Sequence, residues 1–591
     1  MLRGRHGNLR SVKAQKKLPL QRATVAPAPV PVARSRRWWY AAGLAILCYV
    51  GFQAYGSVIN GPFVFDDRSL PFFAPDFPNE LRLWITGVRP LLMLSYWINF
   101  QISQTQTLWY HIFNVLLHCA NSFLVFLSVR KILTYPQARV SGSDGQMSLL
   151  LSAFAAGVFL LHPVQTESVA YIAGRSESLS LLFVLGAFTL FLYRRTDAVS
   201  WRVAMGVLLL YVAAVSVKEH AVALIAVLLL TDFFWNPGFS LAGIRKNWRL
   251  YVPAAAGAGL GTIFVWRVLS CATTAGFNIK EFTWYQYFFT QCRAFFLYLR
   301  LVFFPLDQNA DYQFPISRTI LDHGALYGLI GILLLAGFAL YTRERYRLAS
   351  YGFFVYLALL APTSSFVPIQ DPVAERRLYM PIIGMLFIVT DLLQRLPVRR
   401  KLLAGAMAGV LLMAGTLAHE RNRVWTSDVA LWQDTVQKSP QNPRAHFQLA
   451  YAYQYEANQC DQALREYATV DRIAGPAYDK RYGLLVDWGE AYDCLNQPEA
   501  ALAKLRQAAA LEPGAQVYME IGVVAAKHNR IGEALDAVRT AQKLDPNYAK
   551  MFVKRGKLFE KMQQFLPAIE SFRAKPSADH AELPAGGFLH Y

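Results

Sequence analysis

Apolar residues gather in runs along the first two thirds of the chain, with short polar loops between them. A helix that crosses a membrane needs about 20 such residues, so runs close to that length predict transmembrane helices. We interpret eleven runs as spans, several of which must extend into their flanks: 38–59, 110–127, 149–161, 179–193, 203–217, 221–235, 250–268, 325–341, 351–361, 380–393 and 402–418. Two further apolar segments, 89–102 and 285–304, contain arginines, and we interpret both as re-entrant or interfacial helices.

Loops rich in Lys and Arg follow alternate runs, at 130–131, 194–195, 245–249, 343–347 and 395–401. Because short positive loops stay on the cytoplasmic side, this pattern predicts a cytoplasmic N-terminus. With eleven spans the C-terminal part lies on the opposite side, whereas an even number would reverse it.

A different pattern begins near residue 442, where the long apolar runs stop. A period of roughly 34 residues appears, which is typical of tetratricopeptide repeats. Small residues recur in the copies at Gly489, Gly522 and Gly556, and prolines end two of them at Pro513 and Pro546. About four stacked repeats form a concave surface that binds peptide or protein, with a spacer or a dimerisation arm as the alternative.

These patterns predict an all-α protein in four parts. Residues 1–37 form a basic, disordered cytoplasmic tail, and 38–420 form a polytopic transmembrane bundle. Residues 421–575 form an extracytoplasmic solenoid of repeats, and 576–591 form a C-terminal tail.

Composition supports a membrane protein, since 54% of the residues are hydrophobic and only 17% are charged, against about a quarter in soluble domains. The net charge of +20 lies in the tail and the cytoplasmic loops, which favours the positive-inside rule over nucleic-acid binding. The six cysteines lack zinc spacing. Cys460 and Cys494 lie one repeat apart in an oxidising compartment, but helix geometry can keep them apart, and we expect no disulfide.

Carboxylates accompany cations at the edges of the predicted outer loops. The first such loop contains Asp66 and Asp67, followed by Arg68. A carboxylate there can act as general base toward an acceptor hydroxyl. Two adjacent side chains need not face one site, so we expect one to be catalytic and the other structural or metal-binding; a solvated acid capping Arg68 is the alternative. No His or third carboxylate has ligand spacing nearby, so we do not favour a metal.

Polar residues also mark one face of the span 110–127, where His111, Asn114 and His118 follow helical spacing. Polar groups in a span face the bundle or a cavity. We favour hydrogen bonding between helices over catalysis for this stripe.

The loop after the third run contains His162, Pro163 and Glu167, followed by Arg175. Pro163 stops or kinks the helix and exposes polar groups at the interface. Arg175 has the fork geometry to bind a phosphate in a bidentate manner. Interfacial anchoring is the alternative.

Two more clusters lie at span edges. Lys218 and Glu219 join two spans with almost no loop, and they suit either a phosphate contact or an internal ion pair. Glu375, Arg376 and Arg377 precede the tenth span. Positive charge on the outer side opposes the positive-inside trend, so we expect Arg376 or Arg377 to neutralise a phosphate, with Glu375 holding it in place.

The sequence contains no Walker loop, Rossmann fingerprint, HExxH or GxSxG motif, which argues against an ATPase, a redox enzyme or a typical protease. Instead, the motifs follow one order along the chain: FDDR, RPL, YHIFNVLLH, HPVQTE with AGRSE, KE, AERRLYMP and then the repeats. That order resembles the transmembrane and tetratricopeptide-repeat-containing O-mannosyltransferases of the GT-C glycosyltransferase class. The resemblance covers about 40–575, and this chain has fewer repeats than the animal members, as expected of a bacterial relative.

The resemblance implies a polyprenyl-phosphate sugar donor, typically carrying mannose, and inverting transfer to Ser or Thr hydroxyls of a translocated protein. It implies that the catalytic base is Asp66 or Asp67, and that Arg89, Arg175, Lys218 and Arg376 contact the lipid phosphate. No other cofactor is expected. In a bacterium the protein would lie in the inner membrane, and its repeats would bind the acceptor protein in the periplasm. In a eukaryote the protein would lie in the membrane of the endoplasmic reticulum, with its repeats in the lumen.

Two other functions fit parts of the pattern. A non-enzymatic membrane scaffold would use only the repeats, but it leaves the polar clusters without a purpose. A transferase of the same class could instead glycosylate a glycolipid or a polysaccharide, although peptide-binding repeats favour a protein acceptor.

Overall fold

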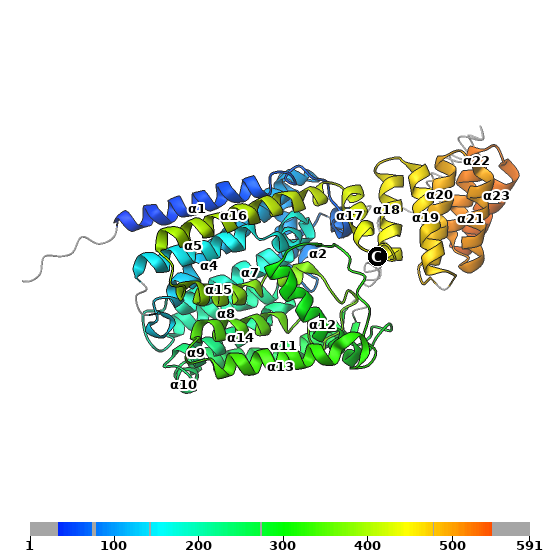
Figure 1. Cartoon of the computed structure of the whole chain (residues 1–591). Coiled ribbons are helices and arrows are strands. Elements are labelled where there is room, and N and C mark those ends of the chain that lie inside the picture. The colour runs from blue at the N-terminus through cyan, green and yellow to red at the C-terminus, as the bar shows by residue number, and fades with distance from the viewer. Residues whose placement is uncertain (1–33, 74–78, 141–143, 272–274, 477, 546–591) are drawn as a thin grey trace, which may run out of the picture.

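The computed structural model describes residues 34–73, 79–140, 144–271, 275–476 and 478–545. Within these ranges the chain is helical, and the only β-type pairing is an isolated bridge between Ala275 and Ile369. A helix bundle forms the larger part, and a stack of shorter helices extends from one end of it (Figure 1). The predicted tails 1–37 and 576–591 lie mostly or wholly outside the described residues.

Each predicted apolar run forms a helix of the bundle. These helices are α1 (Arg34–Ala54), α4 (Thr107–Ile132), α5 (Gly145–Leu161), α7 (Arg175–Leu192), α8 (Trp201–Val215), α9 (Ala223–Trp235), α11 (Trp248–Cys271), α13 (Ala325–Tyr341), α14 (Arg347–Leu360), α15 (Ile382–Gln394) and α16 (Arg400–Arg423). They lie side by side, with α1 and α16 along one face (Figure 1). Local signals set several starts: the side chain of Asp144 caps α5 and that of Ser200 caps α8.

The predicted count of about eleven spans is wrong when the helices are judged by their length and composition. Among the described residues, four helical stretches suffice to cross a membrane: Thr107–Ile132, Ile172–Leu192, Asp322–Tyr341 and Arg400–Thr426. The pair Gly145–Leu161 and Pro163–Ala170, bent by 51° at Pro163, adds a fifth if it is one span. Several other helices are too short, since α8, α14 and α15 contain 15, 14 and 13 residues.

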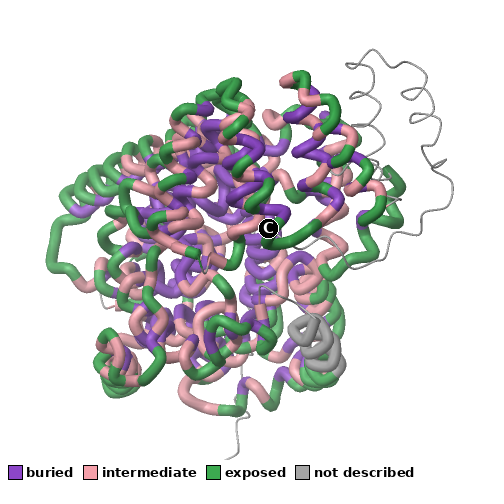
Figure 2. The backbone as a smooth tube through the Cα atoms, turned by 90° about the vertical axis from the view of Figure 1, so that its right-hand side faces the viewer, coloured by how far each residue is buried: buried purple, intermediate pink, exposed green. Residues whose placement is uncertain are grey.

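Helices α13 and α16 expose large apolar side chains on the outer surface of the bundle, as expected of a membrane protein. Exposed residues lie mostly at the periphery of the protein and buried residues lie mostly inside it (Figure 2). On α13, Leu334 and Phe338 expose 68% and 65% of their surface, and on α16, Leu412 exposes 72%. Such large apolar side chains have no reason to face water along whole helices, so these helices face lipid.

Two helices form where the sequence predicts re-entrant or interfacial segments. They are α3 (Pro90–Ser103), which has Pro90 at its first position, and α12 (Trp284–Phe303), which starts with a reciprocal capping box between Thr283 and Gln286. Neither helix is among those that are both long and apolar enough to cross a membrane. The loop after α12 leads toward the repeats (Figure 1).

The repeats form antiparallel helix pairs after the connecting helix α17 (Asp428–Lys438). The pairs are α18 (Pro443–Tyr455) with α19 (Cys460–Ala474), α20 (Arg481–Cys494) with α21 (Pro498–Leu511), and α22 (Ala515–Lys527) with α23 (Ile531–Leu544). A Cβ atom at Gly489 would lie 2.8 Å from Leu505, so a small residue lets α20 approach α21 closely. The predicted fourth repeat lies outside the described residues.

A disulfide joins Cys460 to Cys494, contrary to the expectation from sequence. Cys460 is the first residue of α19 and Cys494 is the last of α20. Helices α19 and α20 belong to successive repeats and lie next to each other in antiparallel orientation. The first residue of α19 and the last residue of α20 therefore lie close together, with Cα atoms 6.3 Å apart. Spacing along the sequence does not reveal this, since it depends on how successive pairs stack.

Removing this disulfide is expected to destabilise the repeats. It closes a loop of 34 residues, so the Cys460→Ser/Cys494→Ser double variant should lose about 2–4 kcal/mol. Urea unfolding followed by Trp488 fluorescence measures the loss, and reduced wild-type protein should match the variant. Equal unfolding midpoints for oxidised wild type and variant would contradict the prediction.

Candidate active site

The two adjacent carboxylates of the first loop point in different directions. Asp67 is fully buried, and its carboxylate accepts hydrogen bonds from the backbone N–H groups of Val64 at 3.1 Å and Ala173 at 2.7 Å. Asp66 is exposed. Asp67 therefore ties the loop to the segment before α7, whereas Asp66 is open to an incoming molecule.

Contacts with both parts of the protein hold this loop in place. Phe65 has a left-handed φ of 52°, and its N–H donates to Asp428 Oδ1 of α17 at 2.9 Å. Its ring packs on Tyr171 and Trp432, with centroids 6.0 and 5.1 Å away. The loop is thus clamped between the bundle and α17, with a strained residue directly before Asp66.

Arg68 completes the clamp from the other side of Asp66. Its guanidinium pairs with Asp428 at 2.8 Å and also contacts Glu456 at the end of α18. A single arginine from the bundle thereby reaches both the connecting helix α17 and the end of the first repeat helix.

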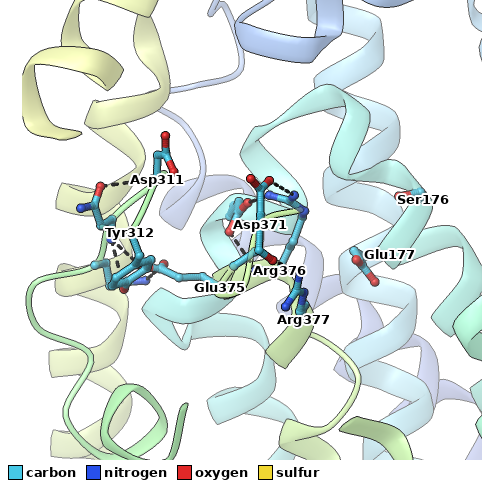
Figure 3. A network of polar contacts seen from close by, with 12 residues as sticks. Ser176, Glu177, Asp311, Tyr312, Asp371, Glu375, Arg376 and Arg377 are labelled. Atoms are coloured by element: carbon cyan, nitrogen blue, oxygen red, sulfur yellow. Dashed lines mark hydrogen bonds and ion pairs between the residues drawn. The ribbon is translucent and has the colours of Figure 1, made fainter. Parts of the chain in front are cut away.

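Arg376 lies beside this loop and is held by carboxylates. Its Nη1 atom donates to Glu167 Oε1 at 2.6 Å, and its backbone N–H donates to Glu167 Oε2 at 2.8 Å. Its Nη2 atom lies 3.6 Å from Asp371 Oδ2. Figure 3 shows Asp371 and Arg376 side by side at the centre of the polar network. With 24% of its side chain exposed, Arg376 is accessible to an anion from solvent.

The first repeat adds a second arginine to the same network. Arg444, in the first turn of α18, pairs with Asp371 Oδ1 at 2.8 Å. It also donates to both carboxylate oxygens of Asp311, at 2.5 and 2.6 Å. Asp371 therefore lies between an arginine of the bundle and an arginine of the repeats.

The surroundings of Asp66 suit a general base. Partial burial raises the pKa of Asp66, the positive charge of Arg376 and the nearby Tyr171 hydroxyl lower it, and the net shift is upward from 3.8. Asp371 and Arg444 also act on this carboxyl group electrostatically. An exposed carboxylate with a raised pKa, beside a held arginine, can take up a proton while the arginine stabilises an anion.

Glu375 and Arg377 have different contacts from those predicted. Glu375 is buried and accepts hydrogen bonds from Gln308, Asn309 and Tyr312, so it holds the loop that carries Asp311 rather than Arg376. Arg377 is also buried and donates to Tyr287 and to backbone carbonyls of 371 and 372. Both residues position neighbouring loops.

A second polar cluster lies at the same end of the bundle. Arg89 and Glu219 form a bidentate ion pair with two contacts of 2.9 Å. Lys218 donates to Glu177 at 2.5 Å and to Ser176 at 3.1 Å. Arg376 is close enough to Lys218 and Glu177 to interact electrostatically, and Figure 3 places Glu177 to one side of Arg376.

No group of three or more His, Cys, Asp or Glu side chains in the described part of the chain is arranged to hold a metal ion.

The sequence of the chain is similar to those of several known proteins. No family model matches the chain. The human protein O-mannosyl-transferase TMTC3 is 23% identical over 90% of this chain, and the Caenorhabditis elegans protein O-mannosyl-transferase F38B6.6 is 23% identical over 69% of it. Its relatives are protein O-mannosyl-transferases of the TMTC family. The chain spans 63% of the human protein and 59% of the worm protein.

Among solved structures, the tetratricopeptide-repeat protein YrrB, described as having an unusual peptide-binding site, aligns with 28% of this chain and 80% of its own, at 20% identity and a TM-score of 0.21.

Arg175, which the TMTC resemblance implied for phosphate binding, is fully buried inside the bundle. Its guanidinium donates to Asn114 Oδ1 at 2.9 Å and to the backbone carbonyls of Ser95 and Tyr110. It also stacks on Tyr96 and Phe113. These contacts connect α3, α4 and α7 and do not bring Arg175 to Asp66.

The histidines singled out alongside the TMTC motifs are buried as well. His118 contacts Tyr379 and the carbonyl of Leu160 at 2.9 and 3.0 Å, which is hydrogen bonding between helices. His162 contacts the carbonyl of Val302 at 2.8 Å. Both nitrogens of His111 lack a hydrogen-bond partner in the structure.

Residues outside the motifs named in the sequence analysis also belong to this polar network. Asp311, Asp371, Tyr171 and Arg444 were not singled out from sequence. Asp371 stands five positions before Arg376 in the same loop, which is the one signal that could have found it. Arg444 belongs to the repeats, and only the docking of the two parts reveals it.

Proposed function

We propose that the chain is a membrane glycosyltransferase that moves a sugar, mannose by its resemblance, from a polyprenyl-phosphate donor to Ser or Thr hydroxyls of a protein. The observation that carries the proposal is the exposed carboxylate of Asp66 beside the doubly held Arg376. The names of the relatives support protein O-mannosyl transfer.

The chemistry is a single displacement. Asp66 takes the proton from the acceptor hydroxyl as its oxygen attacks the anomeric carbon of the donor. The bond between that carbon and the phosphate oxygen breaks, and the phosphate leaves with the electron pair. Arg376 stabilises the developing charge, and Lys218 and Arg89 lie at the same end to assist. Attack from the face opposite to the leaving group inverts the sugar configuration.

The disulfide supports an extracytoplasmic site. Disulfides persist in oxidising compartments and are rare in the cytosol, so the pair Cys460–Cys494 fits repeats in a periplasm or in the lumen of the endoplasmic reticulum. The repeats extend from one end of the bundle (Figure 1), and the loop that carries Asp66 contacts Asp428 at that junction, which supports a site in the same compartment as the repeats.

Transfer of radiolabelled mannose from polyprenyl-phosphate mannose by purified protein tests the proposal. Proteins from the same cells serve as acceptors, and a separate lipid extract tests for a glycolipid product. Label in protein is expected. Label in the lipid extract alone would favour the glycolipid alternative, and no label with any of several polyprenyl-phosphate sugars would favour the scaffold.

The rate should depend on pH through Asp66. A general base must be ionised, so kcat/KM is expected to fall as the pH falls through the pKa of Asp66. Because that pKa is raised from 3.8, the fall should occur at a pH above 3.8. The variant Arg444→Gln removes a charge that lowers this pKa, so its acidic limb should move to higher pH. An acidic limb at or below 3.8, unmoved in the variant, would contradict the assignment.

A further inference from the structure

An open cavity of about 740 Å³ lies where the bundle meets the first repeat. Its walls come from the loop 311–316 after α12, the loop 370–373 before Glu375, and the entry to α18 at 441–444. Its size lies within the range of about 300–1,000 Å³ that is usual for ligand sites.

The cavity adjoins the candidate active site through Asp371. This residue lines the cavity and lies 3.6 Å from Arg376 on its other side. Asp371 and Arg444, both cavity residues, are close enough to act electrostatically on Asp66. The wall of the cavity therefore lies within electrostatic range of Asp66.

The less exposed charges in the cavity wall are already matched, and the exposed Glu281 and Arg318 add one charge of each sign to the lining. Arg444 is engaged by both oxygens of Asp311 and by Asp371, at 2.5 to 2.8 Å. A phosphate would have to compete with two carboxylates for this arginine, which disfavours an anionic ligand.

The remaining lining suits a neutral polar chain. Gln313, Gln370 and Gln441 are exposed side-chain amides, which both donate and accept hydrogen bonds as backbone peptide groups require. Phe282 and Ile316 supply apolar surface between them. Amides interspersed with apolar surface match an extended polypeptide.

We propose that this cavity is the acceptor subsite, which holds the polypeptide that flanks the reacting Ser or Thr while its hydroxyl reaches Asp66. The proposal rests on the proposed function and adds where, and by which residues, the protein acceptor is held.

Narrowing the cavity tests the proposal. In the whole chain, Gln441→Trp and, separately, Gln313→Trp add bulk to the cavity wall, and Gln507→Trp, at an exposed position of α21 that does not line the cavity, is the matched control. With a synthetic peptide rich in Thr and Ala as acceptor, the KM for peptide is expected to rise about tenfold or more, which corresponds to about 1.4 kcal/mol. The KM for the polyprenyl-phosphate sugar should stay within twofold of wild type, roughly the spread of surface substitutions.

A binding measurement separates failure of this proposal from failure of the proposed function. A photo-crosslinking benzoylphenylalanine at 441 should capture the labelled peptide, and the same group at 507 should not, whether or not sugar is transferred. Normal peptide KM in both cavity variants, with no crosslink above the 507 control, would overturn the acceptor subsite while transfer itself remained. A KM increase for the lipid donor instead would assign the cavity to the donor and also overturn the proposal.

Discussion

Asp66→Asn is expected to abolish sugar transfer while leaving the protein folded. The Asp66 side chain is exposed, and its loop is held by Phe65, Asp67 and Arg68 rather than by Asp66 itself. Asn has the same shape but cannot take up a proton, so the loss is that of a general base, about 100- to 10,000-fold in kcat. Initial rates with saturating donor and acceptor measure it.

Asp67→Asn, in the neighbouring residue, is expected to lower stability rather than the rate of transfer. Asp67 accepts two backbone hydrogen bonds in the interior, and an amide offers only one oxygen for them, so one N–H group loses its acceptor. We expect a loss of stability of about 1–3 kcal/mol. The folded fraction of this variant should retain more activity than Asp66→Asn. Full activity of Asp66→Asn, or equal loss per folded molecule in both variants, would refute the assignment of the base.

Arg376→Gln is the second substitution with a large expected effect. Arg376 is oriented by Glu167 through its side chain and its backbone, which leaves its guanidinium preorganised for a leaving phosphate. Removing one such charge-stabilising donor should lower kcat by about 100- to 1,000-fold. The KM for the acceptor peptide should change little, because the charge develops on the donor. Steady-state kinetics with each substrate varied in turn check both expectations.

Two variants sharpen this test. Arg423→Gln removes an exposed arginine that pairs only with Glu420 within α16, and it should leave the rate unchanged. Glu167→Gln keeps Arg376 but weakens the contacts that orient it, so the kcat of this variant should lie between those of wild type and Arg376→Gln. If Arg376→Gln raises only the KM for peptide, then Arg376 acts in acceptor binding and its assigned role is wrong.

Sequence reasoning located the helices better than it judged their lengths. Apolar runs appear in the sequence because each helix must bury or expose apolar surface along its length. The ends of these runs depend on loops and neighbours, and α14 and α15 end after 14 and 13 residues. The disulfide was missed for a related reason, since it depends on the stacking of helix pairs.

The candidate site divides in the same way. The acid–base clusters stood out because charged groups are costly beside apolar runs. Which side chain of a cluster is open was not predictable. Asp67 is buried against Ala173 whereas its neighbour Asp66 is open, and Arg377 is buried against Tyr287 whereas its neighbour Arg376 is partly exposed. Arg444 could not be found at all from local pattern, since its partners Asp311 and Asp371 lie far from it in the sequence.

The link from Arg68 to Asp428 and Glu456 limits how the protein can be divided or recombined. A truncation before α17 would remove both partners of Arg68, together with the acceptor of the Phe65 N–H group. The loop that presents Asp66 would then lose its outer support. An exchange of repeats between homologues should therefore begin after Glu456, so that the transplanted segment leaves this support intact.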